Sequence, residues 1–444
     1  MSQAFEKKRF VLDPSKYDAL CTCRRRHPTP EIKIYSADDA YSVLAEDCKK
    51  FVGEGCVLLL DDENTHLAAG AKLARCLDKK SVKYKLIKLP GDSSVTDILA
   101  DKIFNECNGH DLILSVGAGT INDLGKFVSS QRKIPYWAVP SACSMNGYTS
   151  SIAAVKVKGV KRTLPALPPS SIYVDPKVIQ NSPLKLRQAG FCDVLAKSVS
   201  DFDWQTESIL FKGSYCHLPT AIVTQSEHRY IDYPEKIKQG NKKAVMGLFD
   251  GLLFSGFAMS LAGSSAPASG GEHLISHFLD MRESRTGRKP ELHGLQVGLG
   301  IVLSAACYQK LACLVKKDLN NIAETIFEAD FKYISSIWGS LASEVEKQFL
   351  KKKERLLQLD NILLPNWEKL RTLFSKVRRP DFFVDLIRRT GFEMTLECLN
   401  ISKDEFLLAA LSSRTIRERI TILDISAHAG VLKEAAEEVI GLLS

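Results

Sequence analysis

Residues that could bind a metal occur in three short motifs of this sequence. They are one aspartate and three histidines: Asp193 in GFCDVLAK, His273 and His277 in GGEHLISH, and His293 in ELHG. Such a set suits a catalytic divalent metal, and a helix would place His273 and His277, four positions apart, on one face. A metal there would polarise a carbonyl or lower the pKa of an alcohol, as redox chemistry at an alcohol carbon requires. Spacing alone also allows a purely structural role for the two helical histidines.

A glycine turn follows a strongly apolar segment in LILSVGAGTINDLGKF. The pattern predicts a strand, a turn containing Gly117 and Gly119, and a helix from Thr120. Glycines let a ligand approach the backbone, and the amides at a helix start suit a pyrophosphate. The third glycine of the dinucleotide fingerprint GxGxxG is absent. The turn therefore indicates phosphate binding, with an ordinary strand-to-helix connection as the alternative.

The chain from Glu31 onward alternates short apolar segments with amphipathic ones. The predicted strands are EIKIY, CVLLLDD, YKLIKL, LILSV and YWAVP, with helices between them. This alternation predicts a parallel sheet with helices packed on it. After a β-rich connection through IYVD the chain becomes mostly helical, beginning with SPLKLRQAG. We therefore expect an extension over residues 1–30, an α/β dinucleotide-binding domain over 31–180 and an all-α metal- and substrate-binding domain over 181–444.

Two carboxylates, Asp61 and Asp62, end the predicted strand CVLLLDD. Ligands of open α/β sheets bind at the carboxyl ends of strands. A carboxylate there can accept hydrogen bonds from an adenosine ribose and repel a 2′-phosphate, which would favour NAD over NADP. Helix capping is the alternative role.

Composition is typical of a globular protein of more than one domain. The 444 residues are 45% apolar and 25% charged, and the net charge of +8 is moderate, so we do not expect nucleic-acid binding. The start, MSQAFEKKRF, lacks the apolar core of a secretory signal, and the apolar segment Leu248–Ala262 is short and contains Asp250. We expect a buried helix there, no membrane span and a cytoplasmic protein with reduced thiols.

The N-terminal segment contains Cys21, Cys23 and His27 beside three arginines. No second cysteine pair with zinc-finger spacing accompanies them. The sequence therefore predicts a basic linker at this place and no metal site.

Five motifs in order resemble the sn-glycerol-1-phosphate dehydrogenases of the metal-dependent polyol dehydrogenase and 3-dehydroquinate synthase superfamily. They are GAGTINDLGK, IPYWAVPSACSMNGYTSS, AGFCDVLAKSVSDFDW, AGSSAPASGGEHLISH and LHGLQVGLG, and the similarity continues to TIRERITILD. An extra stretch between about Asp330 and Pro380 makes the chain similar to the longer bacterial branch of this family. The resemblance implies a dehydroquinate synthase-like fold and an NAD(P)-linked, metal-dependent interconversion of dihydroxyacetone phosphate and sn-glycerol 1-phosphate.

The resemblance also implies roles for particular residues. Asp193, His273 and His293 would bind the metal, which could be Zn²⁺, Ni²⁺ or Fe²⁺, and His277 would face the substrate and relay a proton. The small phosphorylated substrate would meet Lys161 or Arg162, unless these two belong to a solvated loop. The expected cofactor contacts, beside Asp61, are Gly117, Ala118, Gly119, Thr120, Asp123, Ser141, Ser144 and Ser150. A homodimer is also expected from the family.

One residue departs from the family pattern, because SMNG replaces SMDG and Asn146 stands where the family has a substrate-contacting aspartate. Asparagine keeps an acceptor and adds a donor but loses the charge. Two alternatives follow. One is a cyclase of the dehydroquinate synthase type, which Lys197 allows but Asp193 opposes, since such cyclases have a glutamate at that metal position. The other is a non-catalytic nucleotide-binding paralogue, against which the complete set of metal ligands argues.

Overall fold

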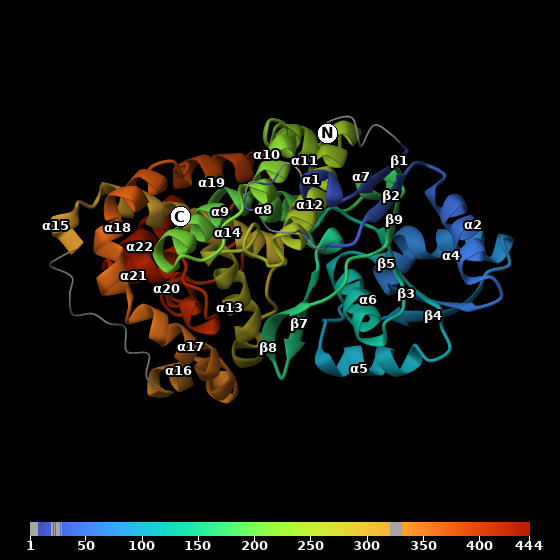
Figure 1. The fold of residues 1–444 in the computed structure, drawn as a ribbon, viewed down its shortest axis with the longest axis horizontal. Helices are drawn as coiled ribbons and strands as arrows, with labels where there is room; N and C mark the ends of the chain where they lie inside the picture. Colours follow the sequence, from blue (N-terminus) through green and yellow to red (C-terminus); the bar gives the residue numbers. More distant parts are fainter. Residues whose placement is uncertain (1–7, 19–20, 22, 24–26, 28, 320–330) are drawn as a thin grey trace. The chain divides into compact units, whose positions relative to one another are not determined.

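The computed structural model describes residues 8–18, 21, 23, 27, 29–319 and 331–444 (Figure 1). The chain forms two compact units. The first consists of Met1–Val194 and Cys216–Ser265, and the second consists of Leu195–Tyr215 and Ala266–Ser444.

A seven-stranded sheet is the centre of the first unit, and its strands run in the order β1-β2-β9-β6-β5-β3-β4. All neighbouring pairs are parallel except β1 and β2. A separate antiparallel hairpin is formed by β7 and β8. The strand bounds are β1 Arg9–Leu12, β2 Ile32–Ser36, β3 Cys56–Asp62, β4 Lys83–Leu89, β5 Leu112–Gly117, β6 Tyr136–Pro140, β7 Ile152–Val157, β8 Val160–Pro165 and β9 Ser171–Val174.

Helices cover both faces of this sheet. On one face, Leu44 and Leu73 from two helices join Leu59 and Leu114 of the strands in one buried apolar cluster. The opposite face carries α6, which approaches Ser115 through Gly125. The helices of the sheet region are α1 Ser15–Asp18, α2 Ala40–Val52, α3 Glu63–Thr65, a π-helical turn η1 His66–Gly70, α4 Ala71–Lys79, α5 Asp97–Glu106, α6 Gly119–Arg132, the 3₁₀ turn η2 Gly147–Thr149 and α7 Pro176–Gln180.

The predicted α/β and all-α classes are confirmed, and every predicted strand is present. The sequence patterns did not reveal β1, and they predicted only a β-rich connection where the β7–β8 hairpin and β9 lie. Strand β1 has only four residues, and β8 is half-buried along most of its length, so neither has a strong apolar signal. Because β1 pairs with β2, residues of the predicted N-terminal extension belong to the sheet.

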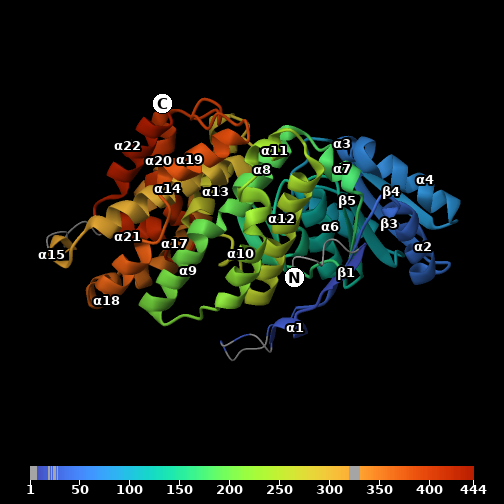
Figure 2. The ribbon, with the colours of Figure 1, turned by 90° about the horizontal axis from the view of Figure 1, so that it is seen from above.

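Four more helices belong wholly or mostly to the first unit: α8 Leu184–Leu195, α10 His217–Ile231, α11 Pro234–Lys238 and α12 Lys242–Ala262. Helix α12 is apolar and long enough to span a membrane, as is α14 of the second unit, His293–Cys313. Their most apolar windows are 94% and 83% buried within the protein. Both are therefore core helices, as predicted for Leu248–Ala262 (Figure 2).

The described parts of the second unit contain helices and loops but no strand, and the buried helix α14 forms the centre of this unit. Around it lie α9 Lys197–Phe211, α13 Gly271–Thr286, α15 Lys316–Leu319, α16 Phe331–Trp338, η3 Gly339–Leu341, α17 Ala342–Leu356, α18 Leu359–Phe374, α19 Pro380–Arg389, α20 Lys403–Ser412, η4 Ser413–Ile416, α21 Ile422–His428 and α22 Leu432–Leu442.

The charged helix α17 differs from a simple solvated helix. Its Val345, Phe349 and Lys352 are buried. The Lys352 ammonium lies 2.9 Å from Oδ2 of Asp424 and donates to the Arg414 carbonyl oxygen at 2.8 Å. One of its many lysines is thus an internal ion-pair partner.

Candidate active site

The glycine turn joins β5 to α6, and the predicted strand, turn and helix are confirmed, with the helix starting at Gly119. A Cβ atom at Gly117 would lie 2.5 Å from Cβ of Ile121, so no larger residue fits there without movement. A Cβ atom at Gly119 would meet only Cγ of Met145, at 3.5 Å. Position 117 is thus restricted by the protein itself, whereas position 119 is open. The turn also carries Ala118 and Thr120.

The first two turns of α6 contain a charged pair whose lysine is buried. Lys126 lies 3.2 Å from Oδ1 of Asp123, and it also donates to the Gly147 carbonyl at 2.7 Å and to the Ser150 hydroxyl at 3.0 Å. Complete burial lowers the pKa of Lys126, and Asp123 opposes that shift. The amide of Ala154 donates to Oδ2 of Asp123 at 3.1 Å. Asp123 and Ser150 thus bind the segment after β6 to the helix.

Asp61 lies at the end of β3, as predicted, but its side chain is completely buried. Its Oδ2 is 2.7 Å from Nδ1 of His66. Burial raises the pKa of Asp61, and His66 opposes that shift. The neighbouring Asp62 is half-buried and caps α3 through a 2.7 Å bond from the Thr65 amide. Asp61 therefore has a structural partner, and the capping alternative is realised by Asp62.

The segment after β6 carries Ser141, Ser144 and Asn146. The Ser141 amide donates to the Gly117 carbonyl at 3.2 Å, which holds this segment beside the glycine turn, and Ser144 is half-buried. The side-chain nitrogen of Asn146 is buried, and no described residue accepts a hydrogen bond from it. The predicted substrate position thus presents an amide donor inside the protein.

Asp193 contacts this segment from α8. The backbone amide of Asn146 donates to its Oδ2 at 2.7 Å. The close approach depends on Gly190, because a Cβ atom there would overlap the Cys143 carbonyl oxygen. The motif GFCDVLAK thus combines a glycine for contact with the chain and a carboxylate one helical turn later. Asp193 belongs to the first unit.

Lys161 and Arg162, the candidates for the substrate phosphate, lie on β8. Both are half-buried strand residues and not part of a loop. Register places Lys161 opposite Lys156 and Arg162 opposite Val155.

The three predicted histidines come together in the second unit. His273 and His277 are on α13, and His293 begins α14. The ring centroids of His273 and His293 are 5.2 Å apart, and that of His277 lies 6.2 Å from His273 and 5.7 Å from His293. His273 and His277 are nearly completely buried.

Hydrogen bonds orient the rings of His273 and His293. Nδ1 of His273 lies 2.8 Å from Oε1 of Glu272, and Nδ1 of His293 lies 2.7 Å from the Ser276 hydroxyl oxygen. That hydroxyl donates to Oε1 of Gln296 at 3.0 Å, so it accepts from His293. Both histidines then carry their protons on Nδ1, and the lone pair lies on Nε2, where it could bind a metal. Metal-binding histidines commonly have such partners.

His277 has a different neighbour, Arg417, whose guanidinium donates to Nε2 at 2.9 Å. An arginine cannot accept a proton, so Nε2 is the acceptor and this ring is neutral. Burial and the nearby Arg419 lower the pKa of Arg417 to about 10. Sequence reasoning missed Arg417, although it lies in the TIRERITILD motif used only to mark the end of the similarity.

Asp203 is a second residue that sequence reasoning missed. From α9, it accepts hydrogen bonds from the amides of Gly271 at 2.7 Å and Ile422 at 2.6 Å, and from the Tyr308 hydroxyl at 2.8 Å. Burial raises the pKa of Asp203 to about 7, and the nearby Glu272 adds to this shift. Asp203 holds the start of α13, the helix that carries two of the histidines.

Solved structures with the same fold include dehydrogenases. Glycerol dehydrogenase from Schizosaccharomyces pombe superposes with a TM-score of 0.57 at 15% identity, covering 93% of this chain and 92% of its own. An archaeal halo-thermophilic alcohol dehydrogenase from a Red Sea brine pool gives 0.60 at 15% identity, covering 94% and 99%. At this identity the similarity concerns the fold, and it confirms the expected dehydroquinate synthase-like architecture.

Sequence relatives give the family. Residues 36–183 match the family described as iron-containing alcohol dehydrogenase. Glycerol-1-phosphate dehydrogenase [NAD(P)+] from Geobacillus thermodenitrificans is 33% identical over 331 residues, which cover 72% of this chain and 77% of the relative. The enzyme of that name from Methanobrevibacter smithii is 30% identical over 62% of this chain and 77% of its own. This chain therefore belongs to the glycerol-1-phosphate dehydrogenase family.

Proposed function

We propose that this protein is a metal-dependent, NAD(P)-linked dehydrogenase that interconverts dihydroxyacetone phosphate and sn-glycerol 1-phosphate. The main structural support is the pair His273 and His293, whose Nδ1 atoms are both engaged so that Nε2 can bind a metal. Family membership supports the substrate and the cofactor.

The proposed metal ligands are Asp193, His273 and His293. One carboxylate and two neutral imidazoles are a donor set that zinc, nickel and ferrous iron all accept, so the identity of the metal stays open to experiment. Three protein ligands leave room for substrate. Polarisation of the C2 carbonyl of the ketone is the chemistry that such a metal supplies when bound.

His277 is proposed as the proton carrier. In the reductive direction an oxygen at C2 must gain a proton, and an imidazole can relay it. Arg417 donates to Nε2 of His277 and so keeps this ring neutral and oriented. The positive charge of Arg417 also suits an anionic substrate, in addition to the earlier candidates Lys161 and Arg162.

The dinucleotide is proposed to bind at the turn of Gly117, Ala118, Gly119 and Thr120, where the first amides of α6 suit a pyrophosphate. Hydride transfer is the chemistry that the nicotinamide supplies. Ser141 and Ser144 remain proposed contacts. Asp123 and Ser150 are proposed to act by shaping this region, since both are hydrogen-bonded to Lys126 or its neighbours.

Asp61, the proposed selector between NAD and NADP, has its carboxylate buried against His66. Asp62 is the more accessible of the pair. A homodimer and a cytoplasmic location also remain proposals that rest on the family and on the apolar helices being core helices.

Neither alternative function is favoured. A cyclase does not fit the relatives, which are named as dehydrogenases. A non-catalytic paralogue would not need to keep the partners Glu272 and Ser276 beside two candidate ligands. Asn146 replaces a carboxylate at the proposed substrate position, but Glu272 and Ser276 still hydrogen-bond to the two candidate ligands.

The deciding experiment follows NADH oxidation with dihydroxyacetone phosphate. Metal-stripped protein is compared with protein reloaded with Zn²⁺, Ni²⁺ or Fe²⁺, and Asn146→Asp is measured in parallel. We expect turnover only in reloaded protein. No turnover in any metal form of either variant would contradict the proposal, and turnover only in Asn146→Asp would mean that the natural protein acts on another phosphorylated ketone.

A further inference from the structure

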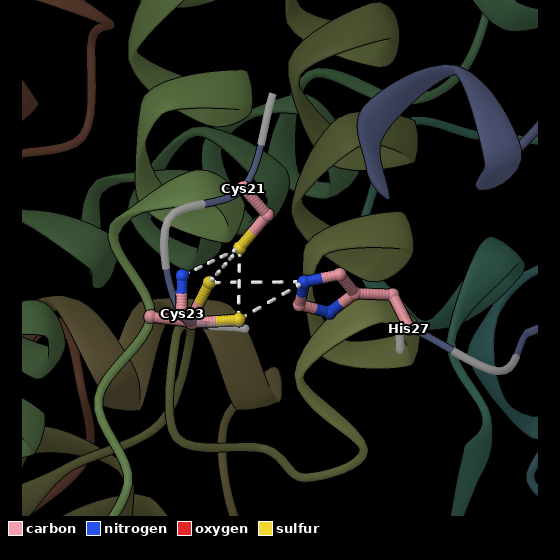
Figure 3. A group of neighbouring side chains, drawn as sticks. Cys21, Cys23 and His27 are labelled. Atoms are coloured by element: carbon pink, nitrogen blue, oxygen red, sulfur yellow. Dashed lines mark hydrogen bonds between the residues drawn. The ribbon is translucent and has the colours of Figure 1, made fainter. Parts of the chain in front are cut away.

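Three residues of the N-terminal segment meet a fourth from far along the chain. Cys216, just before α10, lies next to Cys21, Cys23 and His27. The Cys21 sulfur is 2.8 Å from that of Cys23 and 3.2 Å from that of Cys216. Nε2 of His27 is 3.5 Å from the Cys23 sulfur and 3.9 Å from the Cys216 sulfur. Figure 3 shows the sulfurs and the imidazole edge pointing into one small space.

These separations suit a single metal ion. Ligands about 2.0–2.3 Å from a tetrahedral zinc stand roughly 3.5–3.8 Å from one another. The four candidate ligand atoms all lie within 4.8 Å of one another, and the separations given above bracket the expected value. Three sulfurs and one imidazole nitrogen are a soft donor set that favours zinc and disfavours magnesium or calcium.

The ring of His27 is held in the orientation that metal binding needs. Its Nδ1 is 2.8 Å from the carbonyl oxygen of Leu261, in the last turn of α12. A carbonyl can only accept, so Nδ1 carries the proton and Nε2 has the lone pair on the side of the sulfurs. His27 is 5% and Cys216 is 7% exposed, whereas Cys21 and Cys23 are half-buried, so the cluster is partly shielded from solvent.

We propose that Cys21, Cys23, His27 and Cys216 bind one zinc ion in a structural site separate from the catalytic histidines. Four protein ligands leave no open position for a substrate, which distinguishes a structural zinc from a catalytic one. Binding would release the thiol protons to solvent. The expectation of a plain basic linker did not consider Cys216, which lies 189 positions from His27. Arg24, Arg25 and Arg26 lie outside the described residues.

The zinc ion would fasten the N-terminal segment to the ends of α10 and α12. Two contacts point to the same role. Strand β1 pairs with β2 at the edge of the sheet, and Tyr17 packs on Phe257 of α12 with ring centroids 5.7 Å apart. The metal would therefore add a strong cross-link to a segment that already contacts the sheet through β1 and α12 through Tyr17.

A disulfide is the competing interpretation of the same cysteines. It would use two of the three sulfurs and leave the third sulfur and His27 without an explanation. The sulfur separations of 2.8 and 3.2 Å exceed the roughly 2.05 Å of a disulfide bond. The cluster is therefore better explained by a metal.

The first test measures the number of zinc ions per chain in the full-length protein by elemental mass spectrometry. We expect Cys216→Ser to contain about one zinc fewer than the natural protein. Cys48→Ser, a change at another buried cysteine, which lies on α2, should keep the natural content. Unchanged zinc in folded Cys216→Ser would overturn the proposal.

The second test uses the natural protein and does not depend on a variant that folds. Cobalt-loaded protein should show the near-ultraviolet absorption of cobalt–thiolate charge transfer, which the proposed aspartate and histidine site cannot produce because it has no sulfur. Absence of this band, or an intact mass two protons lower owing to a disulfide, would overturn the proposal. Dehydrogenase activity plays no part in either readout, so this inference and the proposed function can fail separately.

Discussion

The imidazole of His273 and the carboxylate of Glu272, its neighbour in the chain, are joined by a 2.8 Å hydrogen bond between Nδ1 and Oε1. Glu272 is fully buried and also accepts from the Gly270 amide at 2.7 Å. Glu272→Gln removes the charge that makes the ring a stronger ligand. We expect the affinity for the activating metal to fall about 10- to 100-fold, measured by titrating metal-stripped enzyme. Glu283→Gln, on the same helix, is the control and should leave the affinity unchanged; an equal loss in both variants would contradict this role.

Arg417 should control the protonation and orientation of His277. Arg417→Met removes the donor to Nε2, so we expect kcat to fall by about 10-fold or more and the pH dependence of kcat to change. Arg417→Lys should restore part of the rate because it keeps a donor and a charge. Arg371→Met, at an exposed position of α18, is the control. A lower kcat in Arg417→Met with an unchanged pH profile would indicate a merely structural role.

Asn146 should donate a hydrogen bond to the substrate, because its buried side-chain nitrogen has no acceptor among the described residues. Asn146→Ala is expected to lower kcat/KM for dihydroxyacetone phosphate about 10-fold, the usual cost of roughly 1 to 2 kcal/mol for one lost hydrogen bond. The melting temperature should hardly change. Asn181→Ala is the exposed control. Equal kcat/KM in natural protein and Asn146→Ala would remove Asn146 from the substrate site.

The two glycines of the turn should respond differently to alanine. Gly119→Ala has room in the protein, so we expect weaker NADH binding with little change in melting temperature. Gly117→Ala would press on Ile121 and should lower the melting temperature as well. Fluorescence titration with NADH and thermal unfolding distinguish the two effects. Unchanged NADH affinity in Gly119→Ala would argue against a dinucleotide at this turn.

Asp250 should make stability depend on pH. It is buried in α12 with Oδ2 2.6 Å from the Arg229 guanidinium, and burial raises its pKa to about 8, an effect that Arg229 opposes. A carboxyl whose pKa is raised on folding stabilises most below its unfolded pKa of about 4, and this contribution is lost as the pH rises towards 8. The loss can reach about 1.4 kcal/mol per pH unit.

The check compares melting temperatures at about pH 5.5 and pH 7.5, a range within that window. The natural protein should lose more stability across this interval than Asp250→Asn does. Asp92→Asn, at an exposed position, should behave like the natural protein. Parallel pH profiles for the natural protein and Asp250→Asn would contradict the raised pKa.

Much of the fold could be predicted because its signals are local. The apolar strands of the parallel sheet stand out in the sequence, and so does the glycine turn between β5 and α6. The grouping of His273 and His277 also follows from helical spacing. Strand β1 was missed because four residues carry too little pattern to distinguish a strand from a linker.

The features that escaped prediction depend on distant partners. Arg417 meets His277 across 140 positions, and Cys216 meets His27 across 189. Nothing in the local sequence distinguishes Lys352 from the other lysines of the charged helix α17, because its partner Asp424 is 72 positions away. The position of Asp61 at a strand end predicted a contact with the cofactor ribose. In the structure its carboxylate instead contacts His66 of η1. Composition and local spacing do not predict contacts between residues so far apart in the sequence.

The chain passes from one unit to the other between residues 194 and 195, again between 215 and 216, and finally between 265 and 266. The second crossing, between residues 215 and 216, brings α10 and α12 to the first unit. There the Thr149 hydroxyl donates to the Leu253 carbonyl oxygen, and Tyr148 packs on Phe249 of α12. A single genetic crossover near residue 180 would therefore join a sheet from one parent to its supporting helices from another. Homologous recombination within this family should accordingly preserve whole genes more readily than exchange their halves.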